Sequence, residues 1–388
     1  MSVASAPQEP AKPAGEQDRN FRFFDNRQKY LLFVNTTSEK LVVANRVASE
    51  LAHLKPKPPA LRLFDAGVGD GSVLTRVMRA AHHRFPNVPF YVVAKEISLE
   101  DMRLTLAKLA DRFCEHPATV VVLTNLNYAD APWLTPKAPD AAARVMWKEV
   151  RLTGRDSHDF ETQIAGLEPF LTEAWAAGVS PKTGNPTYKH PSVLVIHRDD
   201  QTFALDAVIP RQGQVRADYD LVIASQPYRA RASLDFKVKK VIAPLARALG
   251  PGGRLIAIQS HGGDPAQEIV QAVWPGDNPF LHDRHMILKG LEQELGGAGL
   301  GLRFEDQPDS QALFKYAMHT LPSEVEGSIG TSTAFAAWNA AVYVSQVEDQ
   351  RLAQAVSDSR YLDATSAVLR KHGGLWFWDE AYIVTRQG

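Results

Sequence analysis

Short apolar runs alternate with longer amphipathic stretches between residues 60 and 130, and no other feature of the sequence restricts the fold as strongly. The run Thr-Val-Val-Val-Leu-Thr is typical of a buried strand, whereas the longer stretches have the apolar spacing of helices. The expected order is strand 61–66, helix 72–85, strand 89–95, helix 99–114 and strand 119–124. Because strands that alternate with helices form βαβ units, the sequence predicts an α/β protein with a parallel sheet and helices on both faces.

The same alternation returns from residue 218 onward. We expect, in chain order, strand 219–224, helix 238–249, strand 253–259, a strand-like run at 314–321 and a last strand at 381–386. Glycines and a proline at 250–253 mark the turn between that helix and the strand after it. Residues 60–130 and 218–388 are therefore predicted to form one domain.

The remaining segments are expected to lie outside this domain or to be inserted into it. Residues 1–20 carry three prolines and few apolar side chains, so we expect a disordered tail. Residues 21–59 have helical spacing and end in a proline-rich stop, which predicts an N-terminal helical segment. Residues 131–217 are expected to form an inserted cap, and residues 322–375 a helical insertion. The cap is expected to contain a helix at 160–177 and hairpin strands at 193–197 and 202–208.

Composition excludes several classes of function. Lys and Arg number 43 against 44 Asp and Glu, so the formal net charge of −1 disfavours a non-specific nucleic-acid binder. The single cysteine, Cys114, excludes an intramolecular disulfide and a cysteine-rich metal site. No apolar run has the length of a membrane span, and residues 1–20 lack the apolar core of a signal peptide. We therefore expect a cytoplasmic protein without membrane contact.

A glycine-rich loop follows the first predicted strand, in the order Asp65-Ala66-Gly67-Val68-Gly69-Asp70-Gly71. Glycines let the backbone turn tightly and approach a ligand, and the helix that follows offers free N–H groups. The dinucleotide fingerprint requires Gly or Ala where Ser72 stands, which disfavours NAD. The loop instead resembles motif I of the class I S-adenosylmethionine-dependent methyltransferases. The resemblance implies cofactor contacts from Asp65, Ala66, Gly67, Gly69, Asp70 and Gly71, with Asp65 holding the cofactor ammonium directly or through water.

Polar residues after the second and third strands add to this resemblance. In the family, an acidic residue at the end of the second strand accepts both ribose hydroxyls, and Glu96 stands there, followed by the apolar Ile97 beside adenine. The same segment also fits a helix-capping turn. After the third strand the family usually has Asp or Asn at the adenine amino group. By position these roles fall to Asn125 and Leu126, with Asn127 and Asp130 as rivals.

The loop after strand 219–224 reads Ser225-Gln226-Pro227-Tyr228. It resembles the (Asp/Asn/Ser)-Pro-Pro-(Tyr/Phe) motif of methyltransferases that act on planar nitrogens, with Gln226 in place of the first proline. The resemblance implies that Ser225 and a main-chain carbonyl accept hydrogen bonds from the target nitrogen and that Tyr228 stacks on the planar group. His261, after strand 253–259, is a candidate general base, although such a histidine more often orders a loop.

Two further expectations concern metals and overall architecture. The sequence His-Asp-Arg-His at 282–285 is read as a polar cluster that opens a helix, so we expect no metal. The family resemblance implies a Rossmann-like, seven-stranded, mostly parallel sheet whose last strand is antiparallel. The insertion 322–375 either pairs two subunits in a homodimer or roofs the pocket, and apolar spacing alone does not choose between them.

Taken with the resemblance, these residues predict an S-adenosyl-L-methionine-dependent methyltransferase that releases S-adenosyl-L-homocysteine. The two insertions are expected to enclose a pocket, which favours a small or medium-sized acceptor, with nitrogen as one candidate atom. One alternative is methylation of a protein side chain or a nucleic-acid base. Another is a non-catalytic regulatory protein that binds the cofactor without turnover.

Overall fold

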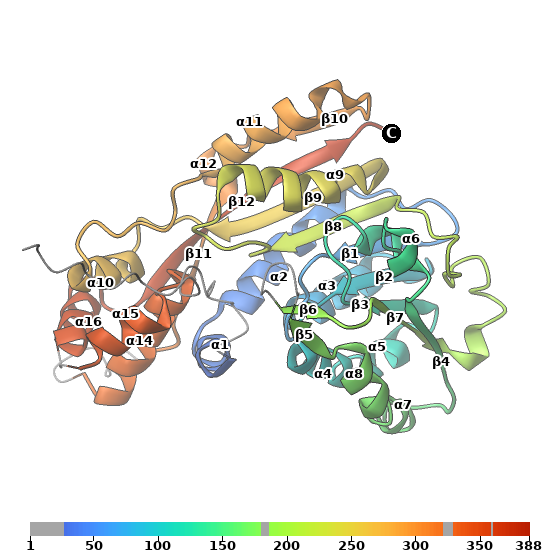
Figure 1. The fold of residues 1–388 in the computed structure, drawn as a ribbon, viewed down its shortest axis with the longest axis horizontal. Helices are drawn as coiled ribbons and strands as arrows, with labels where there is room; N and C mark the ends of the chain where they lie inside the picture. Colours follow the sequence, from blue (N-terminus) through green and yellow to red (C-terminus); the bar gives the residue numbers. More distant parts are fainter. Residues whose placement is uncertain (1–26, 180–185, 321–328, 358–359) are drawn as a thin grey trace, which may run out of the picture.

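The structure is a computed structural model that describes residues 27–179, 186–320, 329–357 and 360–388 (Figure 1). The expected tail 1–20 lies outside these residues. Within the described part of the chain, no helix has both the length and the apolar character that crossing a membrane requires.

A ten-stranded, mostly parallel sheet forms the centre of the molecule, in the order β10-β12-β9-β8-β1-β2-β3-β7-β4, with β11 paired to β12. The strands are β1 Leu61–Asp65, β2 Phe90–Lys95, β3 Thr119–Thr124, β4 Met146–Leu152, β7 Ser192–Arg198, β8 Tyr219–Ser225, β9 Leu249–Ser260, β10 Leu302–Glu305, β11 Leu313–Ala317 and β12 Trp376–Arg386. Six of them, β1, β2, β3, β8, β9 and β12, correspond to strands expected for this domain. The expected run 314–321 forms β11, which pairs with β12 off the main path, and β10, which takes the place beside β12, was not expected. As expected, β12 is antiparallel to its neighbour β9.

The chain order reverses at β1, which pairs with β2 on one side and β8 on the other. The register places Asp65 beside Ala94 of β2 and beside Ile223 of β8. The carboxyl ends of three strands therefore meet at one level. In open α/β sheets, ligands bind at such a switch point.

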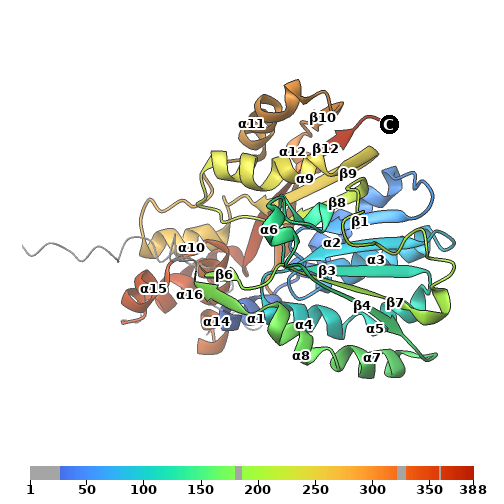
Figure 2. The same ribbon diagram turned by 45° about the vertical axis from the view of Figure 1, so that its right-hand side comes forward.

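Helices cover both faces of the sheet (Figure 2). The helices of one face are α2 Glu39–Ser49, α3 Ser72–Arg84, α4 Leu99–Ala107, α5 Ala110–Glu115, α7 Ser157–Ala165 and α8 Glu168–Ala174. The helices of the other face are the π-helix η5 Phe236–Ile242, α9 Ala243–Arg247 and α11 Arg284–Leu295. Three predicted helices are interrupted: 99–114 becomes α4 and α5, 160–177 becomes α7 and α8, and 238–249 becomes η5 and α9. Short α6 Pro139–Ala142 and α12 Asp309–Ala312 complete these layers.

A helical cluster lies beyond the carboxyl ends of β8 and β9, at the left of Figure 1. It consists of α1 Arg27–Thr36, α10 Pro265–Val273, α14 Thr331–Val344, α15 Asp349–Ala355 and α16 Arg360–His372. Aromatic rings join its N-terminal and C-terminal parts, because Phe33 lies 4.8 Å from Tyr343 and 6.1 Å from Phe377, centroid to centroid. The N-terminal segment and the helical insertion thus share one apolar core.

The insertion 131–217 differs from the prediction. Its strands β4 and β7 extend the main sheet beyond β3, and a small hairpin of β5 Ala177–Val179 and β6 Pro186–Tyr188 follows α8. The expected hairpin of 193–197 with 202–208 is wrong, because β7 is followed by a 3₁₀ turn and a run of further turns. Leu205 and Val208 are buried three residues apart, which is turn spacing and not strand alternation.

Candidate active site

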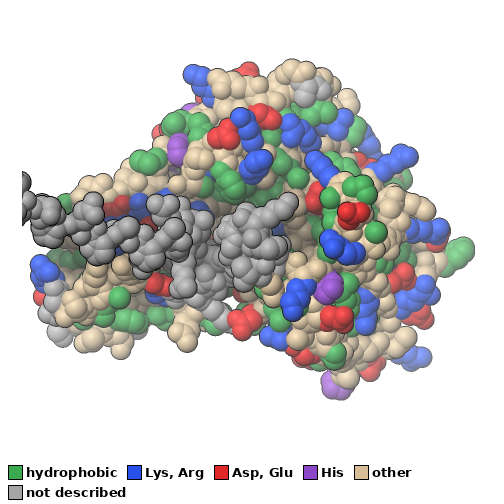
Figure 3. Space-filling view, in the orientation of Figure 1, with side chains coloured by type: hydrophobic (Ala, Val, Ile, Leu, Met, Phe, Trp, Pro, Cys, Tyr) green, Lys and Arg blue, Asp and Glu red, His purple; other side chains and the backbone are tan. Residues whose placement is uncertain are grey.

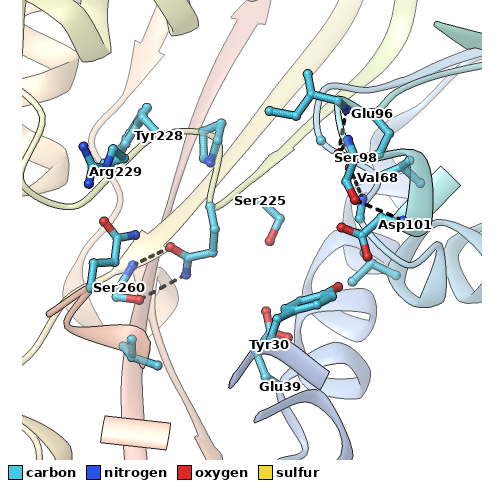
Figure 4. A pocket seen from close by; sticks show the side chains of 18 of the residues that line it. Tyr30, Glu39, Val68, Glu96, Ser98, Asp101, Ser225, Tyr228, Arg229 and Ser260 are labelled. Carbon is cyan, nitrogen blue, oxygen red and sulfur yellow. Dashed lines mark hydrogen bonds between the residues drawn. The ribbon is translucent and has the colours of Figure 1, made fainter. Parts of the chain in front are cut away.

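A cavity of about 700 Å³ opens at the carboxyl ends of β1, β2 and β8. Its walls come from the glycine loop, the N-terminal helices, the loop after β8 and the end of α14. Figure 4 shows Ser225 between a wall that carries Glu96, Ser98 and Asp101 and a wall that carries Tyr228 and Arg229. The helical insertion therefore borders the cavity, which agrees with the expectation that it roofs the pocket. None of the described residues of 131–217 lines it.

Asp65 and two loop glycines form the start of the site. The Asp65 side chain is 2% exposed, lines the cavity and accepts a hydrogen bond from the Gly67 N–H at 3.1 Å. Burial raises the pKa of Asp65 to about 7. A Cβ on Gly67 would meet no atom within 4 Å, so the loop leaves open space there, whereas a Cβ on Gly69 would lie 3.0 Å from the Tyr30 hydroxyl. The geometry suits a cationic group held against Asp65.

Three other predicted cofactor residues contact the protein itself and not the cavity. Gly71 is the N-cap of α3 at φ of +78°, and a Cβ there would lie 2.9 Å from the Thr105 backbone. Asp70 accepts hydrogen bonds from Ser72 and forms an ion pair with Lys108 at 2.9 Å. Ala66 is fully buried in the sheet. None of these three predicted cofactor residues is among the described residues that line the cavity.

Glu96 connects β2 to the glycine loop. Its carboxylate accepts hydrogen bonds from Gly69 N at 2.8 Å, Ile97 N at 2.6 Å and Ser98 N at 2.8 Å. Ser98 in turn caps α4 by accepting from Asp101 N at 3.2 Å, so the alternative capping role is confirmed. Glu96 and Ile97 also line the cavity, which means that one segment both caps a helix and presents a carboxylate to the site.

The loop after β3 is placed differently from its prediction. Asn125 donates to the carbonyls of Ala174 at 3.0 Å and His190 at 2.9 Å, and its oxygen accepts from Ser192 N at 2.9 Å. Leu126 packs in the core, and neither residue lines the cavity. The reason is that the insertion continues the sheet past β3 and turns this loop into its anchor. Of the rivals, Asn127 and Asp130 bond to each other at 2.7 Å.

Gln226 anchors the loop after β8 to the neighbouring strands. It adopts φ of +47°, and its amide donates to Ser260 Oγ at 3.2 Å and to the Asp379 carboxylate at 3.3 Å. Its side-chain oxygen accepts from Ser260 N at 3.3 Å. A proline could not adopt this positive φ, so the loop bends differently from one with proline at this position, and the bonds of Gln226 hold it with Ser225 facing the cavity (Figure 4).

Tyr228 lines the cavity, and its hydroxyl points into the protein core. The hydroxyl lies 2.8 Å from Gln259 Oε1 and 2.7 Å from the Tyr382 hydroxyl. Burial raises the pKa of Tyr228 well above its ordinary value, so the phenol stays neutral. The hydroxyl holds the ring, and the ring is the part available to a ligand.

His261 lies away from the described residues that line the cavity. Its Nδ1 is 3.4 Å from Glu380 Oε2, and this partner raises the pKa of His261. Glu380 is buried and also pairs with Arg284 at 3.3 Å. The expectation that His261 acts as a general base is therefore not supported by its position, and it orders the loop after β9.

Several lining residues were not anticipated. They are Tyr30, Phe33, Glu39, Lys40, Lys95, Tyr128, Tyr316, Tyr343 and Gln346. Most belong to helices far away in the sequence, where no local pattern marks a ligand site. Lys95 is different, because a charged residue that ends an otherwise apolar strand next to Glu96 is a visible signal.

Comparisons with known proteins give fold-level likeness only. No protein-family model matches the sequence, and no curated protein matches it. Similar solved structures include the cyclase SpnF, at 13% identity and a TM-score of 0.34, with 88% of this chain and 80% of that chain covered. A geranyl diphosphate methyltransferase in complex with GPP and sinefungin shares 14% identity at a TM-score of 0.33, covering 89% and 77%. Phosphoethanolamine N-methyltransferase 2 of Haemonchus contortus, in complex with S-adenosyl-L-methionine, shares 11% sequence identity at a TM-score of 0.31. That match covers 96% of this chain and 61% of the other chain.

The sheet itself defines the fold class. Its strand order, with the antiparallel β12 beside β9, is the Rossmann-like arrangement that the resemblance to class I methyltransferases implies. The likenesses above are low, and what the site does follows from its own residues.

Proposed function

We propose that the protein is an S-adenosyl-L-methionine-dependent methyltransferase for a small or medium-sized acceptor. The observation that carries this proposal is the meeting of Asp65, the open glycine loop and Glu96 on one cavity, opposite Ser225 and Tyr228. When bound, the cofactor would supply a sulfonium-bound methyl group whose carbon–sulfur bond breaks as the acceptor bonds to that carbon, with S-adenosyl-L-homocysteine as the leaving group.

The residues present fit this cofactor. Asp65 is a buried carboxylate with one backbone hydrogen bond, which suits an ammonium group. Gly67 has no atom within 4 Å of a Cβ position, so a ligand can approach the backbone there. Glu96 lines the cavity at the end of β2, and beyond its three backbone hydrogen bonds its carboxylate keeps acceptor capacity for one further hydroxyl.

The acceptor side is built for positioning. Direct displacement needs a nucleophile held close and in line more than it needs proton transfer. Ser225 presents a hydroxyl, and Tyr228 presents a fixed ring on the same wall. The cavity volume of about 700 Å³ lies in the range of small-molecule sites. Acidic and basic side chains are interspersed on the face seen in Figure 3, which favours a small molecule over a polyanion.

Calorimetric titration with S-adenosylmethionine and S-adenosylhomocysteine tests the cofactor. We expect micromolar binding to the wild type and its loss in Asp65→Ala and Glu96→Ala. Asp130→Asn is the matched control, because Asp130 follows a strand but does not line the cavity. Absence of binding to the wild type, with the fold intact by circular dichroism, would refute the proposal.

Tyr228→Ala separates binding from transfer. With a labelled methyl donor and a screen of small acceptors, the variant should lose transfer and keep its affinity for S-adenosylhomocysteine. Equal loss of both would remove Tyr228 from the acceptor side. Wild-type binding without any transfer would favour the regulatory alternative.

A further inference from the structure

Lys95 is a buried cation that faces the cavity without an anionic partner. Its side chain ends β2, it is 5% exposed, and it lines the cavity. Among the described residues its Nζ has no hydrogen bond or ion pair, and it lies over the Tyr128 ring, 4.6 Å from the ring centroid. Burial lowers the pKa of Lys95. A buried ammonium is costly unless an opposite charge satisfies it.

The carboxylates nearest in sequence are committed elsewhere. Glu96 accepts three backbone hydrogen bonds, from Gly69, Ile97 and Ser98. Strand alternation places Lys95 on the sheet face that carries Tyr91 and Val93. Glu96 follows the end of β2 and lines the same cavity, and its charge opposes the lowering of the Lys95 pKa by burial, but no hydrogen bond or ion pair joins the two side chains. An anion that accepts a hydrogen bond from Lys95 can therefore come from the cavity.

The three other described cations that line the cavity, Lys40, Arg229 and Arg231, all have interactions within the protein. Lys40 lies 3.2 Å from Glu39, and Arg231 lies 2.9 Å from Asp277. Lys95 differs from all three, because its three N–H donors are left for a ligand.

Tyr128 places Lys95 next to the acceptor side of the cavity. Its hydroxyl donates to the Pro227 carbonyl at 2.6 Å, within the loop that carries Ser225 and Tyr228. The lysine on the Tyr128 ring is thereby tied to this loop. Apolar and aromatic side chains form much of the surrounding wall, including Phe33, Phe236 and Val344.

We propose that Lys95 binds an anionic oxygen of the methyl acceptor, and that the acceptor is a carboxylic acid with an apolar or aromatic body. The inference rests on the proposed function, since it names the acceptor class of the same site. One lysine matches the single charge of a carboxylate, whereas a phosphate monoester carries nearly two charges. In a water-poor cavity, a charge-assisted hydrogen bond discriminates strongly against a neutral analogue.

The test compares acids with their own amides. Benzoate, 4-phenylbutyrate and octanoate, each with its amide, are titrated calorimetrically into protein saturated with S-adenosylhomocysteine. We expect at least one acid to bind the wild type about tenfold or more tightly than its amide, which is about 1.4 kcal/mol. In Lys95→Met that ratio should fall to near one, with the amide and S-adenosylhomocysteine affinities unchanged.

The matched control is Lys148→Met. Lys148 also lies over an aromatic ring, 5.2 Å from the centroid of Phe170, but it is on β4 and away from the residues that line the cavity. The control should keep the acid-to-amide ratio of the wild type.

The inference is overturned if no acid binds more tightly than its amide, or if the preference for the acid survives in Lys95→Met. It is also overturned if Lys95→Met loses affinity for S-adenosylhomocysteine and keeps the acid-to-amide ratio. Failure of S-adenosylhomocysteine to bind the wild type refutes the proposed function itself. The two failures are therefore distinguishable.

Discussion

Replacement of Gly71 by alanine tests whether the last glycine of the loop serves the packing of α3. Gly71 has φ of +78°, and an added Cβ would lie 2.9 Å from both Thr105 Cα and Thr105 Oγ1. The left-handed backbone costs an L-residue about 1–2 kcal/mol. Overpacking against a backbone atom that cannot rotate away costs about 1–3 kcal/mol more. Gly71→Ala should therefore lower the free energy of unfolding by roughly 2–5 kcal/mol.

Two further variants separate the contributions. Gly213 has φ of +76° and no atom within 4 Å of its Cβ position, so Gly213→Ala carries the backbone strain without the clash. Gly67 has no such φ and no neighbour within 4 Å, so Gly67→Ala should change the free energy of unfolding by about 0.5 kcal/mol or less. Because Gly67 lines the cavity, that variant should instead weaken S-adenosylhomocysteine binding.

Urea denaturation followed by tryptophan fluorescence and circular dichroism measures all three variants. The entropy that alanine removes from the unfolded chain is common to them and cancels in the differences. If the free energies of unfolding of Gly71→Ala and Gly213→Ala differ by less than about 1 kcal/mol, the predicted steric clash with Thr105 is wrong.

Two other perturbations address the site and its support. Since burial raises the pKa of Asp65 to about 7, and a cationic ligand favours the ionised form, S-adenosylhomocysteine should bind more tightly as the pH rises from about 6 to about 8, and the proton released on binding should diminish over the same range. Calorimetry in buffers of different ionisation enthalpy measures this proton, and an Asp65→Asn variant with the same pH dependence would contradict the assignment. Asn125→Ala removes three hydrogen bonds between the β3 loop and the insertion, so urea denaturation should show a loss of about 2 kcal/mol or more. A loss below about 0.5 kcal/mol would show that Asn125 is not the anchor.

Local patterns predicted the strands that carry the site. The apolar run of β3 was placed residue for residue at 119–124, and β1 and β2 within a residue at their ends. Asp65 and Glu96 could be found because each is a charge at the end of such a run. Their meeting at one cavity follows from the parallel register, which the alternation of strands and helices implies.

Long-range packing decided what the sequence did not reveal. Asn125 has the side chain that an adenine contact needs, yet the insertion pairs with β3 and consumes all three of its hydrogen bonds. The sequence could not choose between the two roles of His261, because its partner, Glu380, lies on β12, far along the chain. Tyr30 reaches the glycine loop from a helix that no local motif connects with a ligand.

The strands β7 and β4 of the insertion also change which strand forms one edge of the sheet. Without them, β3 would be the sheet edge, and its six residues are uncharged, β-branched for the most part and fully buried in the native fold. Such a segment, once exposed, is a template for intermolecular strand pairing. The insertion moves the edge to β4, where Lys148, Glu149 and Arg151 interrupt the apolar pattern. Charged side chains on an edge strand oppose the addition of another strand. The insertion therefore protects the sheet against aggregation at the edge farthest from β10.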